Sequence, residues 1–323
     1  MRNGIAVLCA ATAAMSAAVA FAQPDYPNRA VRLVLGFPPG GISDVLGRAI
    51  GAKLSANLGQ QVVIDNRAGA GTTIASDIVA KAPPDGYTLF LQDITTHAIN
   101  VSLYKKLPYD TVRDFTPITL VASSALMLVV HPSLPAKSVK DLIALAKTRP
   151  GQIVYASSGN GTIVHLAGET FKSMANVDMI HVPYKGSSPA VQALLGGEVA
   201  LTFSTLPPAL QQVKIGKLRA LAVTTPKRNT AAPDVPTVSE AGLKDFDVVL
   251  YNGVIGPAGL PAAIVGKMNS ELAKAVSSAE VKSTYNTLGV DPITNTPEQF
   301  AAHIASEIGK LGKAVRAAGA HID

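Results

Sequence analysis

The sequence predicts an α/β protein built from two lobes, between which the chain crosses twice. Strands, glycine-rich turns and helices follow one another in the order β-α-β-α-β within residues 31–91, and a second copy of that order occupies residues 153–203. The C-terminal part adds further strands and helices that return to complete the first lobe. The chain has 323 residues, 48% of them hydrophobic, which is enough for one large or two medium cores.

The first copy begins at Val31–Phe37, which is almost continuously apolar, as a buried parallel strand is, and which runs into a Pro-Pro-Gly-Gly turn. Ser43 or Asp44 is placed to cap the next helix, whose large apolar residues recur every four positions until Gly59 ends it. The remaining elements of this copy are a strand over 62–64, a helix over 72–80 and a strand over 87–91.

An extended stretch over 117–131 and a helix near 138–148 precede the second copy. That copy has strands at 153–156, 179–183 and 199–203, with a helix from the first glycine-rich turn to about 175 and another to 195. The C-terminal part has strands at 218–224 and 246–255, a helix at 261–278, and a last helix that Thr296 and Gln299 begin as a capping box.

The predicted lobes are residues 23–124 plus 246–323 for lobe 1 and 125–245 for lobe 2. The two crossings then lie near Ser123 and Asp245, and two crossings make a hinge.

Residues 1–22 are predicted to be an export signal. Arg2 is followed by an apolar run and then by Ala20-Phe21-Ala22, the small-x-small pattern at which signal peptidase cuts, so we expect cleavage after Ala22 and a periplasmic protein. The single cysteine, Cys9, lies within this signal, which excludes disulfides and thiol catalysis in the mature chain. No later apolar run is long enough to span a membrane.

Charge and motif content exclude several function classes. The chain carries 28 Lys and Arg against 22 Asp and Glu, a net charge of +6 that is dispersed and contains no basic cluster, so we predict no nucleic-acid partner. The six histidines lack metal-ligand spacing, and no phosphate-binding loop or Gly-x-Ser-x-Gly nucleophile motif occurs. We therefore predict no metal, no cofactor and no enzymatic activity.

Four glycine-rich turns are the candidate ligand site, because ligands of open parallel sheets bind beyond the carboxyl ends of the strands. The turns are residues 40–43, 69–72, 159–162 and 186–188. Each leads into a helix start, whose free N–H groups and partial positive charge suit a small carboxylate. Asp44 either caps its helix or accepts a hydrogen bond from a ligand, and His165 either has a structural role or donates to the ligand.

A series of motifs in order along the mature chain resembles one known family. They are Tyr26-Pro27 with Phe37-Pro38-Pro39-Gly40-Gly41 and Asp44; Asp65-Asn66-Arg67-Ala68-Gly69-Ala70-Gly71; Pro84-Asp85-Gly86-Tyr87-Thr88-Leu89; Tyr109-Asp110 with Asp114-Phe115-Thr116-Pro117-Ile118; His181-Val182-Pro183-Tyr184-Lys185-Gly186; and Pro233-Asp234-Val235-Pro236-Thr237 with Glu240-Ala241-Gly242. In these the chain is similar to the substrate-binding receptors of tripartite tricarboxylate transporters, the Bug family of periplasmic binding proteins.

The resemblance implies a type II periplasmic binding fold that closes on a di- or tricarboxylate, an acidic amino acid or an aromatic acid. It also implies that the turn at Pro39, Gly40 and Gly41 and the turn from Ser157 to Thr162 grip a carboxylate. Gly36, Ser204 and Tyr251 depart from the residues common in the family, and these departures are expected to affect the choice of ligand.

The full set of predicted ligand-binding residues combines these turns with their flanks. It consists of Phe37, Pro39, Gly40, Gly41, Ser43, Asp44, Ala70, Gly71, Thr72, Thr96, Ser157, Ser158, Gly159, Gly161, Thr162, His165, Tyr184, Gly186, Ser204 and Tyr251. The predicted partners are a small carboxylate and the membrane components of a tripartite tricarboxylate transporter, and the predicted state is a monomer. Two alternatives remain: an orphan receptor that feeds a signalling partner, and a secreted hydrolase or lyase that uses Asp44 or His165.

Overall fold

A computed structural model describes residues 26–317 of the chain; the predicted export signal and its cleavage site lie outside the described residues. The strands are β1 (Val31–Leu35), β2 (Val62–Asn66), β3 (Thr88–Asp93), β4 (Phe115–Val130), β5 (Val154–Ser157), β6 (Ile180–Pro183), β7 (Leu201–Thr205), β8 (Arg219–Val223), β9 (Val249–Pro257) and β10 (Val290–Pro292). The helices are α1 (Ile42–Leu58), α2 (Thr73–Ala80), α3 (Ile94–Leu103), α4 (Val139–Thr148), α5 (Ile163–Ala175), α6 (Ser187–Leu195), α7 (Leu206–Lys214), α8 (Ala262–Ser277), α9 (Ala279–Leu288) and α10 (Pro297–Ala317). A short 3-10 turn, η1 (Ala70–Thr72), precedes α2.

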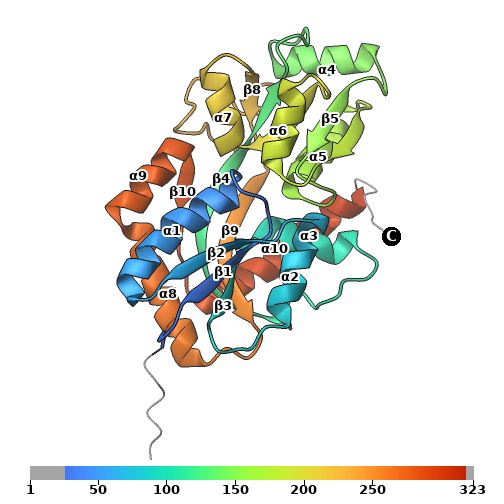
Figure 1. Cartoon of the computed structure of the whole chain (residues 1–323). Coiled ribbons are helices and arrows are strands. Elements are labelled where there is room, and N and C mark those ends of the chain that lie inside the picture. Colours follow the sequence, from blue (N-terminus) through green and yellow to red (C-terminus); the bar gives the residue numbers. More distant parts are fainter. Residues whose placement is uncertain (1–25, 318–323) are drawn as a thin grey trace, which may run out of the picture.

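The predicted two-lobe α/β architecture is confirmed (Figure 1). In one lobe the strand order is β2-β1-β3-β9-β4, with β10 also paired to β4; in the other it is β6-β5-β7-β4-β8. The strand β4 belongs to both sheets. Its 16 residues are mostly apolar and largely buried, as expected for a strand covered along most of its length.

The two segments in which the chain crosses between the lobes are connected by hydrogen bonds to one side chain, that of Thr224. The chain changes sheet within β4, between Ala125, which pairs with β9, and Leu126, which pairs with β7. The second crossing lies between β8 and β9. There the buried hydroxyl of Thr224 accepts a hydrogen bond from the Leu126 N–H (2.9 Å) and donates one to the Val248 carbonyl (2.7 Å).

The predicted parallel pairing of strands is present in both lobes, and antiparallel strands add to each sheet. β1 pairs in parallel with β2 and β3, and β5 pairs in parallel with β6 and β7. Both sheets are mixed, because β9 runs antiparallel to β3 and β4, and β4 runs antiparallel to β7 and β8. The helices α3, α7 and α9 are not predicted from the sequence. The first two begin directly after β3 and β7, so no turn residue separates strand from helix.

The helix caps give one confirmation and one correction. Before α10 the capping box is present: the Gln299 N–H donates to Thr296 Oγ1 (3.2 Å), and the Thr296 N–H donates to the Gln299 side-chain oxygen (3.0 Å). The expected cap of α1 by Ser43 or Asp44 is wrong, since Gly41 is the N-cap residue and no side chain caps the helix. Both polar residues lie within the first turn, because α1 already begins at Ile42.

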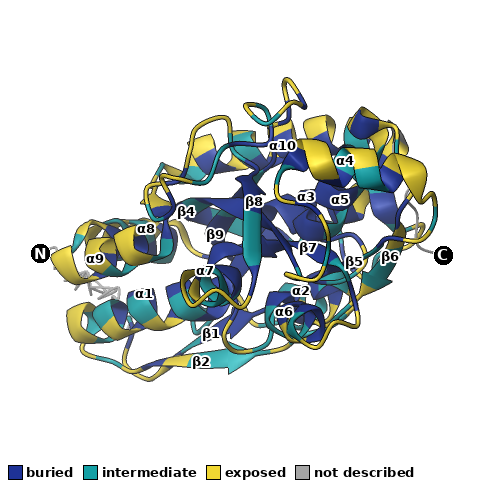
Figure 2. Cartoon of the chain, turned by 90° about the horizontal axis from the view of Figure 1, so that it is seen from above, coloured by how far each residue is buried: buried dark blue, intermediate teal, exposed yellow. Residues whose placement is uncertain are grey.

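Helices cover the sheets and bury a core that runs along β4 into both lobes (Figure 2). The buried faces of these helices carry leucine, isoleucine, valine and phenylalanine, and Ile74, Val101 and Met174 are large apolar side chains that remain exposed on them. Within residues 26–317, no helix combines the length and the apolar character that crossing a membrane requires.

Replacing Thr224 with valine keeps the shape of the side chain and removes its hydroxyl. The Leu126 N–H and the Val248 carbonyl would then remain buried without this partner, at a cost of about 1–3 kcal/mol in the free energy of unfolding. Urea unfolding followed by circular dichroism measures the loss. Thr287→Val, on the exposed surface of α9, is the control, with an expected change within about 0.5 kcal/mol. Equal stability of the two variants would contradict a structural role for Thr224.

Candidate ligand-binding site

Two adjoining cavities lie between the lobes at the carboxyl ends of the parallel strands. The first, called here the serine-lined cavity, has a volume of about 20 Å³ and is lined by Phe37, Pro38, Gly41, Ile42, Ser43, Asp93, Ser158, Ile163, Val164, Ser187, Ser188 and Thr205. The second, the tyrosine-lined cavity, has a volume of about 360 Å³ and is lined by Gly36, Phe37, Gly69, Ala70, Gly71, Thr72, Tyr104, Ser158, Gly159, Asn160, Pro183, Tyr184 and Lys185. The tyrosine-lined cavity falls in the range of small-molecule sites, about 300–1,000 Å³, whereas the serine-lined cavity has room for only a small polar group.

The glycine-rich turns of the two lobes touch across this cleft. The turn after β1 faces the turn before α6, where a Cβ added to Gly186 would lie 2.7 Å from Pro38 Cδ. The turn after β2 faces the turn after β5, where a Cβ on Gly71 would lie 2.9 Å from the Asn160 carbonyl oxygen. These glycines therefore allow the backbones of the two lobes to approach closely, which a side chain at either position would block. The two lobes are in contact at these turns.

Five helices begin at the serine-lined cavity: α1, α3, α5, α6 and α7. Side chains cap α3 and α5, but none caps α1, α6 or α7. The first N–H groups of an uncapped helix lack partners within the helix and carry a partial positive charge. The starts of α1 and α6 therefore offer free N–H groups to a small anion, whereas α7 begins with Leu206-Pro207-Pro208 and its two prolines have no N–H.

Two buried hydroxyls in the same cavity have no hydrogen-bond partner among the described residues. They are Ser188 Oγ, in the first turn of α6, and Thr205 Oγ1, at the start of α7. Thr205 is only 6% exposed. A buried hydroxyl without a partner costs free energy, so both groups are suited to bind a polar ligand atom.

Asp44 holds the turn after β1 instead of entering either cavity. Its carboxylate accepts hydrogen bonds from the Gly40 N–H (3.1 Å), from Arg48 (2.9 and 3.1 Å) and from the Asn66 amide (3.3 Å). Burial alone would raise the pKa of Asp44, but the hydrogen bonds from Arg48, Gly40 and Asn66 outweigh it and lower that pKa. The ionised carboxylate thereby fixes the Pro-Pro-Gly-Gly turn.

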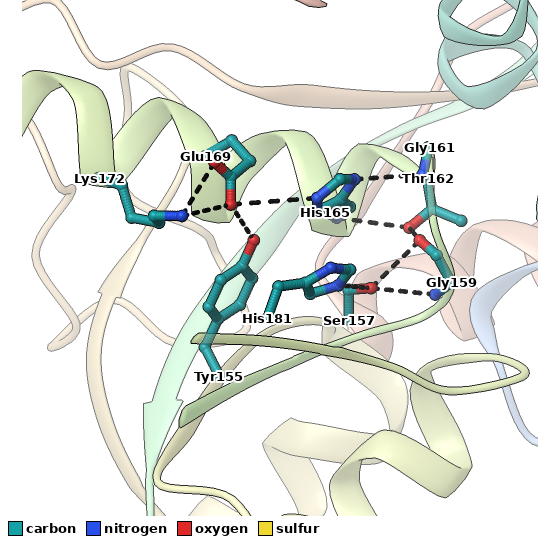
Figure 3. Close-up of polar contacts among 9 residues, drawn as sticks. All are labelled: Tyr155, Ser157, Gly159, Gly161, Thr162, His165, Glu169, Lys172 and His181. Atoms are coloured by element: carbon teal, nitrogen blue, oxygen red, sulfur yellow. Dashed lines mark hydrogen bonds and ion pairs between the residues drawn. The ribbon is translucent and has the colours of Figure 1, made fainter. Parts of the chain in front are cut away.

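A polar network supports the turn after β5 from behind (Figure 3). The Ser157 hydroxyl accepts from the Gly159 N–H (3.1 Å) and shares a hydrogen bond with His181 Nε2 (2.6 Å). The Gly161 N–H donates to His165 Nδ1 (3.2 Å), and Thr162 caps α5. The turn that lines both cavities is thus held in one conformation by side chains outside them.

The two histidines of this network stack face to face, with ring centroids 4.0 Å apart. Burial lowers the pKa of His165, and burial together with the neighbouring His165 lowers the pKa of His181 to about 3. Both rings are therefore neutral near pH 7. His181 also stacks on Tyr155, with ring centroids 4.9 Å apart. The Tyr155 hydroxyl donates to Glu169 (2.6 Å), and Lys172 pairs with the same carboxylate (3.0 Å).

Asp93 and Thr96 connect the lobes at the start of α3. The Asp93 carboxylate caps this helix, accepting from the Thr96 N–H (2.9 Å) and from the Thr96 hydroxyl (2.6 Å). The Thr96 hydroxyl in turn accepts from the Ile163 N–H (3.3 Å), the first residue of α5 in the opposite lobe. Asp93 lines the serine-lined cavity, whereas Thr96 lies just behind it.

The structure brings nine of the predicted ligand-binding residues to the cavity walls: Phe37, Gly41, Ser43, Ala70, Gly71, Thr72, Ser158, Gly159 and Tyr184. Eleven line neither cavity: Pro39, Gly40, Asp44, Thr96, Ser157, Gly161, Thr162, His165, Gly186, Ser204 and Tyr251. Most of these shape the turns. Ser204 instead donates to the Thr205 carbonyl within β7 (2.9 Å), and Tyr251 packs edge-on against His303 of α10 (4.6 Å between ring centroids).

Sequence reasoning missed Asp93 and Thr205 as lining residues. Each is the last residue of a strand that passes directly into a helix, so no glycine or proline marks the position. The signal that was available is the N-cap pattern of Asp93 with Thr96 three residues later. Between residues 26 and 317, no three His, Cys, Asp or Glu side chains are grouped to hold a metal ion.

Comparison with known sequences identifies relatives along nearly the whole chain. A family model described as "Tripartite tricarboxylate transporter family receptor" matches residues 46–320. A UPF0065 protein from the tcbD-tcbE intergenic region of Pseudomonas sp. strain P51 is 38% identical over 291 residues, 90% of this chain and 86% of that protein. Protein BugT of Bordetella pertussis is 37% identical over 313 residues, 97% of this chain and 95% of BugT.

Solved structures agree with the sequence relatives. Rpa4515 of R. palustris, solved with adipate, has a TM-score of 0.89 and 38% identity, covering 92% of this chain and all of that chain (100%). MatC (Rpa3494) from Rhodopseudomonas palustris, solved with bound malate, has a TM-score of 0.84 and 32% identity, covering 90% of this chain and 100% of that chain. On the strength of the family model and these relatives, the chain belongs to the receptor family of tripartite tricarboxylate transporters, in which the Bug periplasmic binding proteins are found.

Proposed function

We propose that this protein captures a small carboxylate between its lobes and delivers it to the membrane components of a tripartite tricarboxylate transporter. As a family member it is a periplasmic solute-binding receptor. The observation that carries the ligand class is the serine-lined cavity, where the uncapped starts of α1 and α6 converge with two unpaired buried hydroxyls. All of these groups are suited to donate hydrogen bonds, as a carboxylate requires.

The ligands of two solved relatives support this class. Rpa4515 was solved with adipate and MatC with malate, and both ligands are dicarboxylates. In this chain the first carboxylate is placed in the serine-lined cavity. The remainder of the ligand extends past Phe37 and Ser158, which line both cavities, toward Tyr104, Tyr184 and Lys185 in the tyrosine-lined cavity.

The geometry favours a receptor over the hydrolase or lyase alternative. Asp44 has both oxygens occupied by hydrogen bonds from Gly40, Arg48 and Asn66. His165 Nδ1 accepts from the Gly161 N–H. Neither residue lines a cavity, so neither is placed to attack a bound molecule. An orphan receptor would keep the same site and differ only in its partner. We propose that the protein is a monomer and that its partner is a transporter.

The proposed mechanism is closure of the two lobes about the hinge at the two crossings. The lobes are proposed to be residues 23–124 plus 246–323 and residues 125–245. The described arrangement, with Thr96 bonded to Ile163 and glycine turns in contact, is the closed form. A ligand that contacts both lobes binds the closed form better and shifts the population toward it.

We also propose that the chain is exported and cut after Ala22. The small-x-small pattern at Ala20-Phe21-Ala22 supports this site.

A thermal-shift screen with small carboxylates, followed by calorimetry, tests the ligand class. At least one acid is expected to bind saturably and without being consumed. Gly41→Leu should then weaken binding of that acid by about tenfold or more, because overfilling a packed site typically costs about 1–3 kcal/mol. Gly41 has an ordinary φ of −82°, and a Cβ there would meet only the Pro38 carbonyl oxygen, at 3.8 Å, so the variant should fold.

Gly266→Leu is the matched control for Gly41→Leu. This glycine lies on the exposed surface of α8 with no atom within 4 Å of an added Cβ, so affinity should stay at the wild-type value. Wild-type affinity in the Gly41 variant would exclude the turn after β1 from the site.

Small-angle scattering tests closure. The radius of gyration should fall when saturating ligand is added to the wild-type protein, since the free lobes spend part of their time apart. Gly41→Leu at the same ligand concentration should show no such decrease. A radius that is identical with and without bound ligand would contradict ligand-driven closure.

Mass analysis of the protein recovered from the periplasm tests export. The expected first residue is Gln23. A chain that still begins at Met1 would overturn the proposed cleavage.

A further inference from the structure

Asp93 is the one ionisable side chain among the described residues that line the serine-lined cavity. Neither lysine nor arginine lines this cavity, and the other polar groups there are hydroxyls and helix starts. The carboxyl group is therefore an exception in a cavity built from hydrogen-bond donors. It is almost completely buried, with 3% of its surface exposed.

The hydrogen bonds of Asp93 leave it able to accept one more. The Thr96 N–H, the Thr96 hydroxyl and the Thr95 N–H donate to its two oxygens. A carboxylate has about four acceptor positions, so about one remains for a group in the cavity. The start of α3 adds a partial positive charge that favours the ionised form.

The ionisation state of Asp93 is set by local groups alone. Burial raises the pKa of Asp93 to about 6, against the opposing effect of the hydrogen bonds from Thr96 and Thr95, and no neighbouring charge contributes. The carboxyl group is therefore ionised at pH 7.5 and becomes protonated below about pH 6. A simple carboxylate bound in the same cavity at pH 7.5 would face a buried negative charge.

We propose that Asp93 makes this receptor selective for acids that carry a hydrogen-bond donor close to the bound carboxylate, as α-amino and α-hydroxy acids do. The inference rests on the proposed carboxylate-binding function and adds a specificity-determining residue to it. The helix starts bind the ligand carboxylate, while Asp93 accepts from the adjacent ammonium or hydroxyl group. An ammonium group is preferred over a hydroxyl group, since it also balances the charge of Asp93.

The same contact connects ligand choice to closure. Asp93 fixes the Thr96 hydroxyl, and that hydroxyl accepts the Ile163 N–H from the opposite lobe. A ligand donor on Asp93 completes its hydrogen bonding while the lobes are closed. A ligand without the donor leaves the buried charge uncompensated in that closed form.

The test compares matched acids on the wild-type protein and on Asp93→Asn. The probes are succinate, malate and aspartate, and the corresponding five-carbon set of glutarate, 2-hydroxyglutarate and glutamate; propionate, lactate and alanine form the monocarboxylate set. Calorimetry at pH 7.5 should show that the wild type binds the substituted acid about tenfold or more tightly than the unsubstituted acid of the preferred set. Asp93→Asn should reduce that ratio about tenfold, chiefly through tighter binding of the unsubstituted acid.

Two further variants separate this effect from folding. Asparagine and serine are both good N-cap residues, so Asp93→Asn should retain the start of α3, and Asp93→Ser serves as the second variant if the first does not fold. Asp234→Asn, at an exposed carboxylate outside both cavities, should keep the wild-type ratio.

The pH profile provides a readout that a purely structural residue would not move. Between pH 7.5 and pH 5 the wild-type preference for the substituted acid should decrease as Asp93 takes up a proton, and this decrease should exceed any change in Asp93→Asn, in which only the acids themselves titrate. Equal ratios in the two proteins, or a wild type that binds the unsubstituted acid equally well, would overturn the selectivity while carboxylate binding stands. If no probe binds any of the proteins, the proposed carboxylate function fails and this inference fails with it.

Discussion

The hydroxyl of Thr224 is the interaction on which the arrangement of the lobes depends. It bonds to one crossing through the Leu126 N–H and to the other through the Val248 carbonyl, so the two connections between the lobes meet at a single buried side chain. Because β4 contributes pairing to both sheets, the position of each sheet is set relative to this point. The strand ends that carry the ligand turns consequently face one another across a narrow cleft.

Because the strand ends face one another, the helices that follow them begin at the same cleft and determine its distribution of charge. Five helices begin at the serine-lined cavity, and the uncapped starts of α1 and α6 supply N–H donors there without an arginine or lysine in the wall, which also holds the carboxyl group of Asp93. Charged side chains close to the turns serve other purposes. Asp44 and Arg48 stabilise one turn, and the neutral pair His165 and His181 supports another. A dipole-based site of this kind is held by the backbone, and long flexible side chains need not be ordered when a ligand enters.

The two-lobe α/β fold, most of its strands and helices, and the glycine-rich turns could be predicted because each has a local signal. The run at Val31–Leu35 is apolar and ends in prolines and glycines, and the capping box at Thr296 marks its helix. Asp93 and Thr205 could not be found in this way, since their strands enter helices without a turn. The role of Asp44 depended on Asn66, more than twenty residues away in the chain, a partner that only the folded structure brings near. Local patterns thus predict elements, whereas contacts between elements decide which side chain reaches the ligand.

The approach of the lobes through Gly71 and Gly186 has an evolutionary consequence. At these points the surfaces that meet consist of backbone or lie against a rigid proline ring, so closure depends little on the identity of other side chains. Asp93, the residue proposed to distinguish one acid from another, occupies a different position in the cavity wall. Substitutions in the wall could therefore change the nutrient that a descendant of this protein recognises, while the proposed closing movement is inherited without alteration.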